Sequence, residues 1–330
     1  MEQRAFSRIG RPVSVVGLGT WQLGADWGPV DDAEAFAILS AAIESGVTFL
    51  DTADVYGDGR SERLIGRFLG ELQGSGADDV FVATKMGRRG PQDPAQFTQD
   101  NFRLWTDRSR ANLGVDTLDL VQLHCPPGPV LDADAVYDAL DTLVAEKRVA
   151  AYGVSVETCD EALTAIARPN VASVQIILNA FRRKPLERVL PAAQAAGVGI
   201  IARVPLASGL LSGRYGRDTV FAAEDHRNFN RHGEAFDVGE TFSGVDYDTG
   251  VEAATEFARL APEGMTPAQA ALRWVIQQPG VTSVIPGART VEQSRANAAA
   301  AQLPALPDAT LAAIQELYDR RVRAQVHDRW

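Results

Sequence analysis

The stretch between residues 118 and 204 decides the fold class, because it repeats one pattern. Four apolar runs, LDLVQL (118–123), VAAYGV (149–154), VASVQIIL (171–178) and VGIIARV (198–204), are separated by segments with helical periodicity at 133–146, 159–167 and 186–196. Strands that are apolar on both faces and alternate with helices are typical of parallel βαβ units buried on both sides.

The same pattern continues on both sides of this stretch. Further strands are predicted at 13–17, 47–50, 80–84 and 281–285, and helices at 31–45, 61–72, 97–113, 249–260, 266–278, 291–301 and 308–322. Eight strand–helix units favour an α/β protein with a (β/α)8 TIM barrel. A doubly wound open sheet is the alternative, because a count of strands does not show that the sheet closes.

Three additions to the barrel are expected: an N-terminal hairpin, a long loop after strand 7 at residues 208–244, and an extra C-terminal helix. A loop of that length is uncommon unless it forms a lid or is disordered. No linker or low-complexity tract divides the chain, so we expect a single domain over residues 1–330.

Composition excludes several classes of protein. The 330 residues carry 32 Lys+Arg against 43 Asp+Glu, a formal charge of −11, which argues against nucleic-acid binding. Cys125 and Cys159 are too few for a disulfide framework, and the N-terminus has no apolar signal core. No apolar run approaches the roughly 20 residues of a membrane helix. We therefore expect a cytoplasmic protein with a small-molecule partner, present as a monomer or weak homo-oligomer.

Four polar residues follow neighbouring predicted strands. Asp51 and Tyr56 come after the second strand, Lys85 after the third and His124 after the fourth. Each alone could be a cap, a surface charge or a loop aromatic, but in a barrel the carboxyl ends of strands meet at one rim. An ammonium beside a phenol favours the phenolate and lowers the phenol pKa. Such a set suits proton transfer to a carbonyl oxygen, with a hydride from a bound cofactor.

Three motifs carry a resemblance to a known family. The segments FLDTADVYG (49–57), VATKMG (82–87) and LVQLHCPP (120–127) resemble the catalytic stretches of the aldo-keto reductase superfamily, whose fold is the (β/α)8 barrel. The resemblance implies a catalytic tetrad of Asp51, Tyr56, Lys85 and His124. It makes Tyr56 the general acid in reduction, Lys85 with Asp51 the groups that lower its pKa, and His124 the group that orients the carbonyl.

The cofactor implied by this resemblance is NADP(H), with NAD(H) less favoured. Gly17-Leu-Gly19 begins like a dinucleotide fingerprint, but position 22 is Gln22, so that motif fails. In the family this region lies near the nicotinamide, VPLASGLLSGRY (204–215) resembles the pyrophosphate loop, and SVIPGARTVEQSRAN (283–297) the segment for the 2′-phosphate. The cofactor-binding residues implied are Gly19, Thr20, Trp21, Asp51, Ser155, Gln175, Arg203, Pro205, Leu206, Ser208, Gly209, Leu211, Ile285, Gly287, Ala288, Arg289, Gln293 and Asn297.

The sequence departs from the family pattern at three of these sites. Val156 replaces an Asn that helps to hold the carboxamide, and Asn179 is a candidate substitute. Arg203 stands where an aromatic is often stacked on the nicotinamide, and a guanidinium plane can also stack. Ala296 occupies a position that is often acidic. Arg289 can pair with a 2′-phosphate through two N–H groups, which favours NADPH.

Three functions are compatible with these motifs. The first is an NADPH-dependent reductase of aldehydes or ketones; the second is an NAD(P)-dependent dehydrogenase of a sugar or alcohol; the third is a cofactor-sensing binding subunit. No metal site is expected, because the six-residue spacing of His226 and His232 is poor ligand geometry. An aromatic-lined substrate pocket is expected from Trp21, Trp27, Tyr56, Phe97 and Trp330.

Overall fold

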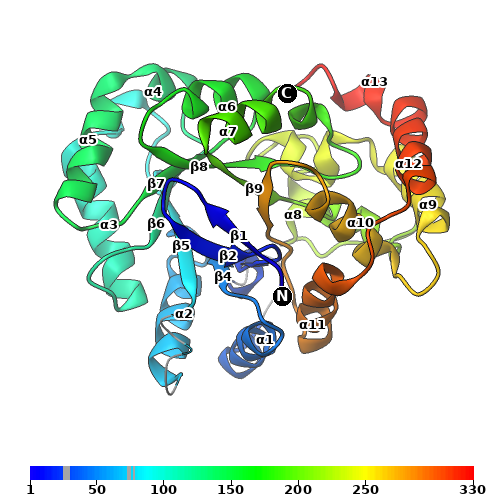
Figure 1. Cartoon of the computed structure of the whole chain (residues 1–330), viewed down its shortest axis with the longest axis horizontal. Coiled ribbons are helices and arrows are strands. Elements are labelled where there is room, and N and C mark those ends of the chain that lie inside the picture. The colour runs from blue at the N-terminus through cyan, green and yellow to red at the C-terminus, as the bar shows by residue number, and fades with distance from the viewer. Residues whose placement is uncertain (25–29, 73–75, 77–78) are drawn as a thin grey trace.

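An eight-stranded parallel sheet forms the centre of the molecule (Figure 1). The computed structural model describes residues 1–24, 30–72, 76 and 79–330. The strands lie in chain order around the sheet: β3 (Leu18–Gly19), β4 (Phe49–Asp51), β5 (Phe81–Met86), β6 (Leu120–His124), β7 (Tyr152–Ser155), β8 (Val171–Ile177), β9 (Gly199–Arg203) and β10 (Val281–Val284).

The two edges of this sheet meet and close it into a barrel. Val16 forms a parallel bridge with Val284, and Gly19 forms one with Gly287. The amide of Gly17 donates to the carbonyl of Val284 at 2.8 Å. The predicted (β/α)8 barrel is therefore confirmed, and the open sheet is wrong.

Helices cover the outside of the barrel (Figure 1). Their bounds lie within a few residues of the predicted ones: α1 (Asp32–Glu44), α2 (Arg60–Glu71), α3 (Gln99–Leu113), α5 (Asp134–Ala145), α6 (Cys159–Ile166), α7 (Val189–Ala196), α9 (Tyr247–Leu260), α10 (Pro267–Ile276), α11 (Val291–Ala299) and α12 (Asp308–Arg321). Side chains cap several helix starts, because the first N–H groups of a helix have no partner within it. Thr158 and Thr266 each form a capping box, with Glu161 and Gln269.

The predicted strand at 13–17 is split between two structures. β1 (Gln3–Phe6) and β2 (Arg11–Ser14) form the expected N-terminal hairpin, and the barrel strand β3 begins only at Leu18. One apolar run serves both because Ser14 pairs with Gln3 in the hairpin, whereas Val16 bridges to the last barrel strand. Phe6 of the hairpin packs on Phe49 and Phe81 of the barrel, with ring centroids 5.9 and 5.7 Å apart.

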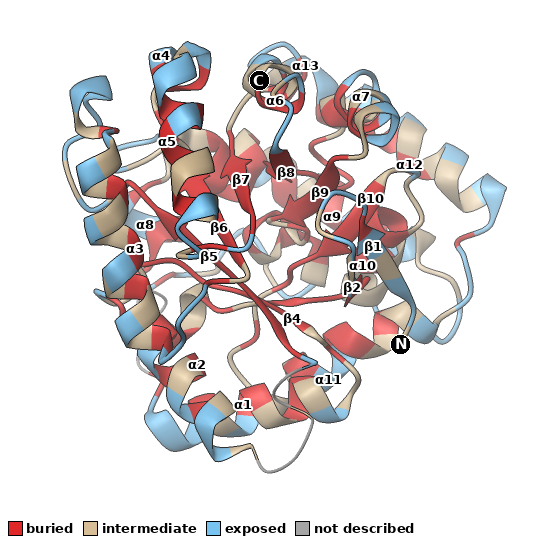
Figure 2. Cartoon of the chain, turned by 60° about the vertical axis from the view of Figure 1, so that its left-hand side comes forward, coloured by how far each residue is buried: buried red, intermediate tan, exposed pale blue. Residues whose placement is uncertain are grey.

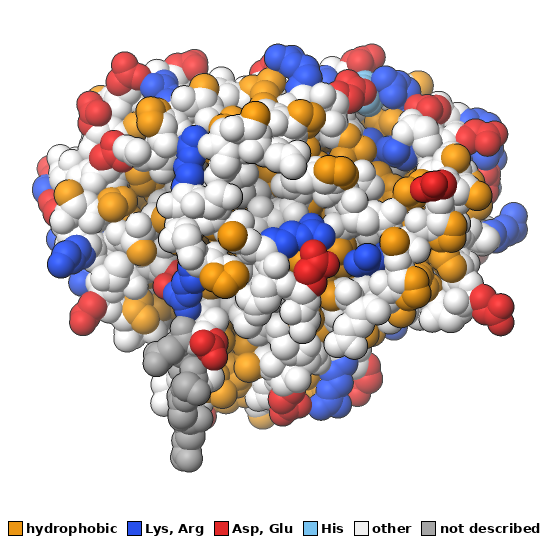
Figure 3. Space-filling model, in the orientation of Figure 1, with side chains coloured by type: hydrophobic (Ala, Val, Ile, Leu, Met, Phe, Trp, Pro, Cys, Tyr) orange, Lys and Arg blue, Asp and Glu red, His pale blue; other side chains and the backbone are white. Residues whose placement is uncertain are grey.

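Burial follows the barrel geometry. Nearly every residue of the barrel strands is buried, whereas the helices alternate buried and exposed positions (Figure 2). Acidic, basic and apolar side chains are interspersed on the face seen in Figure 3. Among the described residues, no helix combines the length and the apolar character needed to cross a membrane.

The long connection after β9 lies across the mouth of the barrel. It contains the short helices η4 (Ala207–Ser212), α8 (His226–Phe229), η5 (Val238–Glu240) and η6 (Phe242–Gly244) before α9 begins. We call residues 207–246 the mouth segment. Beyond α12, α13 (Arg323–Val326) brings the buried Trp330 against it, where the indole Nε1 donates to Asp237 Oδ1 at 3.0 Å.

Candidate active site

Four side chains converge at the carboxyl ends of β4, β5 and β6. Lys85 Nζ donates to Asp51 Oδ1 at 2.6 Å and to Tyr56 Oη at 3.3 Å. The rings of Tyr56 and His124 lie edge to face, with centroids 6.1 Å apart. Parallel strands in register bring these residues together, because each stands at or just after the end of a neighbouring strand.

A network of buried amides holds Asp51 in place. Gln175 Nε2 donates to Asp51 Oδ2 at 2.8 Å, and Gln122 Nε2 approaches the same oxygen at 3.3 Å. The carbonyl of Thr52 accepts a second bond from Lys85 Nζ at 2.8 Å. Asp51 and Lys85 are 2% and 1% exposed, so this buried ion pair has a fixed geometry. Gln175 therefore supports the carboxylate as well as lining the cavity described below.

The charge on Lys85 is stabilised although burial opposes it. Burial disfavours the ammonium, but Asp51 and Tyr56 together hold the pKa of Lys85 above its usual value. For Tyr56, burial raises the phenol pKa more than Lys85 lowers it. Lys85 therefore lowers the pKa of the phenol as expected, but burial outweighs this effect, and Asp51, which was expected to help lower the pKa, raises it. The phenol keeps its proton at neutral pH, as a proton donor must.

His124 is a neutral imidazole. Burial, and then the positive charges of Arg88, Lys85 and Arg203, lower the pKa of His124 well below its usual value. Among the described residues, its Nδ1 atom has no hydrogen-bond partner. A neutral imidazole offers one N–H donor and one acceptor, which suits it to bind a substrate oxygen without transferring a charge.

A cavity of about 760 Å³ is lined in part by members of this group. Its lining includes Tyr56 and His124 and most of the predicted cofactor residues: Gly19, Thr20, Trp21, Asp51, Gln175, Arg203, Pro205, Leu206, Ser208, Gly209, Ile285, Gly287, Arg289, Gln293 and Asn297. These residues come from five separate parts of the chain. The structure therefore brings the three cofactor-like motifs of the sequence to one cavity.

Three predicted cofactor residues do not line the cavity. Leu211 and Ala288 are packed in the hydrophobic core. Ser155 is fully buried, and its Oγ lies 3.5 Å from Cys125 Sγ. Asn179, the candidate substitute for the missing Asn, is occupied elsewhere: its amide donates to the carbonyl of Val204 at 2.9 Å and to Ser243 Oγ at 2.8 Å. In this conformation Asn179 holds the backbone rather than facing the cavity.

The far end of the cavity is formed by the loop between β10 and α11. Gln293 Oε1 accepts from the amide of Arg289 at 2.8 Å, and Asn297 Nδ2 donates to the carbonyl of Gly287 at 3.1 Å. These two residues of one helix face therefore fasten the loop that carries Arg289 to the cavity wall.

The mouth segment contributes charged and aromatic lining residues that were not among the predicted cofactor residues, although two of them lie within the motif at 204–215. They are Arg214, Tyr215, Arg227 and Glu240. Arg227 Nη1 donates to Tyr215 Oη at 2.6 Å and its Nη2 to Asp225 Oδ2 at 2.5 Å. Ser208 Oγ donates to the carbonyl of Glu240 at 2.9 Å, so this hydroxyl links the beginning of the mouth segment to a later turn of it. For Arg227 and Glu240, the only indication in the sequence that they belong to a functional region was the length and the arginine content of the segment.

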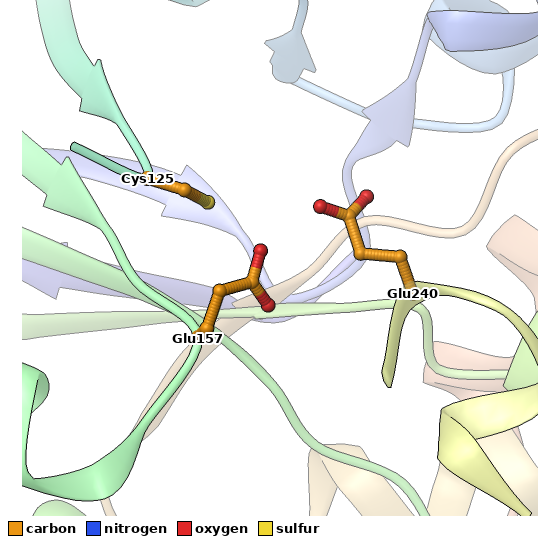
Figure 4. Close-up of side chains that lie close together, drawn as sticks. All are labelled: Cys125, Glu157 and Glu240. Carbon is orange, nitrogen blue, oxygen red and sulfur yellow. The ribbon is translucent and has the colours of Figure 1, made fainter. Parts of the chain in front are cut away.

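Cys125, which directly follows His124 in the chain, converges with Glu157 and Glu240 (Figure 4). Their ligand-type atoms lie within 4.8 Å of one another. Both carboxylates are already paired with guanidinium groups: Arg203 lies 2.7 Å from Glu157, and Arg88 lies 3.2 Å from Glu240. These cations compensate the carboxylates and would repel a metal ion, so we interpret the group as an ion-pair cluster.

The expected aromatic pocket is formed only in part. Trp21 stacks on Tyr56 with ring centroids 6.0 Å apart, and His226 and Phe236 of the mouth segment pack against Trp21. Phe97 packs instead on Phe102 and Trp105, and Trp330 packs behind the mouth segment. Trp27 lies outside the described residues.

Comparison with known proteins agrees with the fold. The model of the aldo/keto reductase family matches residues 15–319. The chain is 28% identical over 301 residues to the aldo-keto reductase YhdN of Bacillus subtilis, covering 90% of this chain and 87% of the relative.

Two solved structures are similar over almost the full length. The glycerol dehydrogenase AKR11B4 from Gluconobacter oxydans superposes with a TM-score of 0.78 at 28% identity, covering 97% of this chain and 96% of the other. An aldo-keto reductase from Klebsiella pneumoniae in complex with NADPH gives a TM-score of 0.70 at 27% identity, covering 96% of each chain. The barrel closed by β3 and β10, the cavity at its mouth and these matches agree: the chain belongs to the aldo/keto reductase family.

Proposed function

We propose that this protein is an NADPH-dependent oxidoreductase that reduces aldehydes or ketones to alcohols, with Tyr56 as the general acid. One observation carries the mechanism: Lys85 Nζ bridges the buried Asp51 carboxylate and the Tyr56 hydroxyl, at 2.6 and 3.3 Å. The Klebsiella relative was solved with NADPH, which supports this cofactor.

The cavity offers hydrogen-bond donors and positive charges of the kind that a dinucleotide needs. Its lining includes Tyr56 and Asn297, and three arginines, Arg214, Arg227 and Arg289, also line it. Ala207, Ser208 and Gly209 have φ values of 47°, 53° and 96°, a left-handed run that turns the chain sharply where it lines the cavity. The cofactor, when bound, supplies the hydride for the carbonyl carbon.

Tyr56 supplies the proton. As negative charge develops on the carbonyl oxygen, the Tyr56 hydroxyl donates its proton to that oxygen, and Lys85 stabilises the phenolate that remains. Asp51 keeps Lys85 charged and in position. The neutral His124 donates an N–H to the same oxygen and orients the carbonyl. The aromatic wall formed by Trp21 shields this end from water.

Oxidation of an alcohol is a second candidate, favoured by the similarity to a glycerol dehydrogenase. The same four residues serve both directions, because Tyr56 can take back the proton that it donates. The relative values of kcat/KM for an aldehyde with NADPH and for its alcohol with NADP⁺ decide between the two.

The direct test is NADPH consumption with a reactive aromatic aldehyde, with NADH in parallel. Tyr56→Phe is expected to lower kcat by about 10²- to 10⁴-fold, because it removes the general acid. Tyr137→Phe on α5, which does not line the cavity, is the matched control. Wild-type activity in Tyr56→Phe would contradict the mechanism. Tight NADPH binding without turnover across a broad panel of carbonyls and alcohols would contradict the proposal that this protein is an enzyme.

Arg289→Gln tests the choice of cofactor. If Arg289 binds the 2′-phosphate, the variant loses about ten- to a hundredfold in NADPH affinity and little in NADH affinity, because NADH lacks that phosphate. Equal losses for both cofactors would show that Arg289 does not read the phosphate.

A further inference from the structure

Three polar side chains from alternate strands meet inside the barrel. They are Asp51 of β4, Gln122 of β6 and Gln175 of β8. Alternate strands of such a barrel fill its interior in layers, and branched apolar side chains dominate these layers. Phe49 and Leu120, two positions earlier on β4 and β6, belong to an apolar cluster of this kind. The layer that contains Gln122 is polar instead.

Gln122 closes a triangle of hydrogen bonds in this layer. Its Nε2 donates to Asp51 Oδ2 at 3.3 Å, and its Oε1 accepts from Gln175 Nε2 at 3.4 Å. Gln175 Nε2 also donates to Asp51 Oδ2, at 2.8 Å. Gln122 is fully buried and, unlike its two partners, does not line the cavity. It therefore acts on a molecule in the cavity only through Asp51 and Gln175.

The triangle fixes which end of the Gln175 amide is available to the cavity. An amide group has two N–H donors on its nitrogen and an acceptor oxygen. One N–H of Gln175 is used by Asp51 and the other by Gln122. Turning the amide over would place its oxygen against the Asp51 carboxylate and the Gln122 oxygen, and acceptors repel one another. Gln175 therefore keeps its acceptor, Oε1, for the cavity that it lines.

The same triangle holds the carboxylate that supports the proposed proton donor. Asp51 Oδ1 accepts from Lys85 Nζ at 2.6 Å, and Lys85 Nζ also donates to Tyr56 Oη at 3.3 Å. Because both amides bind Oδ2, the carboxylate cannot turn away from Lys85 without breaking hydrogen bonds. Buried ion pairs depend on such additional hydrogen bonds, since burial removes the water that would otherwise satisfy the charges.

We propose that Gln122 is a positioning residue for proton transfer and for cofactor binding: it fixes the Asp51 carboxylate beside Lys85 and keeps the acceptor oxygen of Gln175 turned to the cavity. This inference rests on the proposed function, because it assigns Gln122 to the support of Tyr56. An apolar side chain would fill the layer as well, so packing alone does not require an amide at this position.

Two substitutions of Gln122 separate positioning from packing. Gln122→Leu keeps a side chain of similar size and removes both hydrogen bonds. Gln122→Glu keeps the shape, and its carboxyl group reproduces the donor and the acceptor only while it is protonated. Burial and the neighbouring Asp51 carboxylate raise the pKa of the new acid above the usual value for glutamate. Its donor is therefore present in mildly acidic solution and is lost as the pH rises.

The first measurement is kcat for NADPH-dependent aldehyde reduction at pH 5.5, 7 and 8.5, divided at each pH by the wild-type value. Gln122→Leu is expected to lower kcat about tenfold at all three pH values, with the aldehyde KM within about twofold of wild type, because the support of Tyr56 is weakened. Gln122→Glu is expected to stay within about threefold of wild type at pH 5.5 and to fall to the level of Gln122→Leu at pH 8.5. Circular dichroism at each pH verifies that the variants are folded. For a residue that serves packing alone, Gln122→Leu would be harmless.

The dissociation constant of NADPH tests the orientation of Gln175 without turnover. In Gln122→Leu the Gln175 amide is free to turn over, and the constant is expected to rise about threefold. In Gln122→Glu at pH 5.5 it should match the wild type. Gln277→Glu is the matched control, because this glutamine lies outside the cavity and its Oε1 accepts from the amide of Leu306 at 2.9 Å. The control should change neither kcat nor the NADPH constant at any pH.

The outcomes separate this inference from the proposed function. Low activity in Gln122→Leu with recovery in Gln122→Glu at pH 5.5 supports the inference. Wild-type kcat and NADPH affinity in folded Gln122→Leu overturn it and leave the proposed function in place, as does equally low activity of folded Gln122→Glu at every pH. If Gln122→Leu does not fold, the pH dependence of Gln122→Glu alone decides.

A wild type that binds NADPH but turns over no carbonyl or alcohol overturns the proposed function, and with it the part of the inference that concerns proton transfer. An unchanged NADPH constant in Gln122→Leu would then overturn the part that concerns cofactor binding, and a raised one would support it.

Discussion

The strand ends of β4, β5 and β6 and the mouth segment build the same cavity in different ways. At the strand ends, Asp51, Lys85 and His124 are placed by sheet register, and their spacing in the sequence follows the repeat of the barrel. In the mouth segment, Glu240 and Arg227 reach the cavity through short helices and turns without any repeat. The first region determines which reaction is possible, and the second adds charge and shape around it.

The comparison shows where sequence patterns are informative. A strand end in a barrel has one position relative to its neighbours, so a polar residue there has a predictable place. An irregular segment is positioned by contacts with distant parts of the chain. Ser208 bonds to Glu240 and Phe242, and Asp237 bonds to Trp330 at the other end of the sequence.

The largest effect is expected for Lys85→Met at the strand ends. The change removes the charge that stabilises the Tyr56 phenolate in the proposed mechanism, and it leaves the buried Asp51 without its partner. We expect kcat to fall by about 10³-fold and the free energy of unfolding to fall by about 3 kcal/mol. Steady-state kinetics and denaturant titration measure the two effects. Lys184→Met, outside the cavity, is the control. Equal activity of the two variants would contradict the claim that the strand ends carry the catalytic groups.

An effect on stability alone, without a change in kcat, is expected at Asp54, a buried acid of the same region without a catalytic part in our scheme. Among the described residues, neither carboxylate oxygen of Asp54 has a hydrogen-bond partner. Burial, and then Glu62, raise the pKa of Asp54 to about 7. Because this folded-state pKa lies above the unfolded value, the unfolded state loses its proton first, and stability falls as pH rises from about 4 to about 7.

Asp54→Asn is therefore expected to remove this pH dependence. Relative to the wild type, the variant gains up to about 4 kcal/mol between pH 4 and pH 7, and no more above that range. Denaturant titrations at pH 4.5, 6 and 8 measure the difference. Asp58→Asn, at an exposed position, should show no such trend. A constant difference between Asp54→Asn and wild type at all three pH values would contradict the assignment.

The smallest effect is expected at Trp330. This residue supports the mouth segment without lining the cavity, so its substitution tests whether the position of the segment matters for binding. Its indole donates to Asp237, and Arg182 lies 3.7 Å from its ring. Trp330→Ala loosens the segment that carries Glu240 into the cavity. We expect the NADPH dissociation constant to rise about 3- to 10-fold with kcat within about twofold, since one or two modest contacts are lost. Trp105→Ala on α3 is the control, and an equal loss of NADPH affinity there would mean general destabilisation.

Much of the architecture could be predicted from local patterns, because burial on both faces and helical periodicity survive in the sequence. The error at 13–17 arose because one apolar run supplies both a hairpin strand and a barrel edge. The four tetrad positions could be predicted, but their role remains a prediction. Leu211 and Ala288 fall within the right motifs, yet their neighbours Ser212, Gly287 and Arg289 line the cavity instead. Ser155 is buried against Cys125, and the residues on either side of it do not line the cavity.

The sequence by itself determined the eight strand–helix units and the polar residues available at the strand ends, because hydrophobic periodicity and the positions of polar residues are local properties. Closure of the sheet into a barrel depends on the pairing of β3 with β10, which only the tertiary structure shows. Only the tertiary structure decided which charges meet. The pKa of Tyr56 depends on how completely its surroundings exclude water, and the pairing of Arg203 with Glu157 and Glu240 joins residues 46 and 37 positions apart. Desolvation and Coulomb interactions depend on distance in space, and the sequence does not contain that distance until the chain has folded.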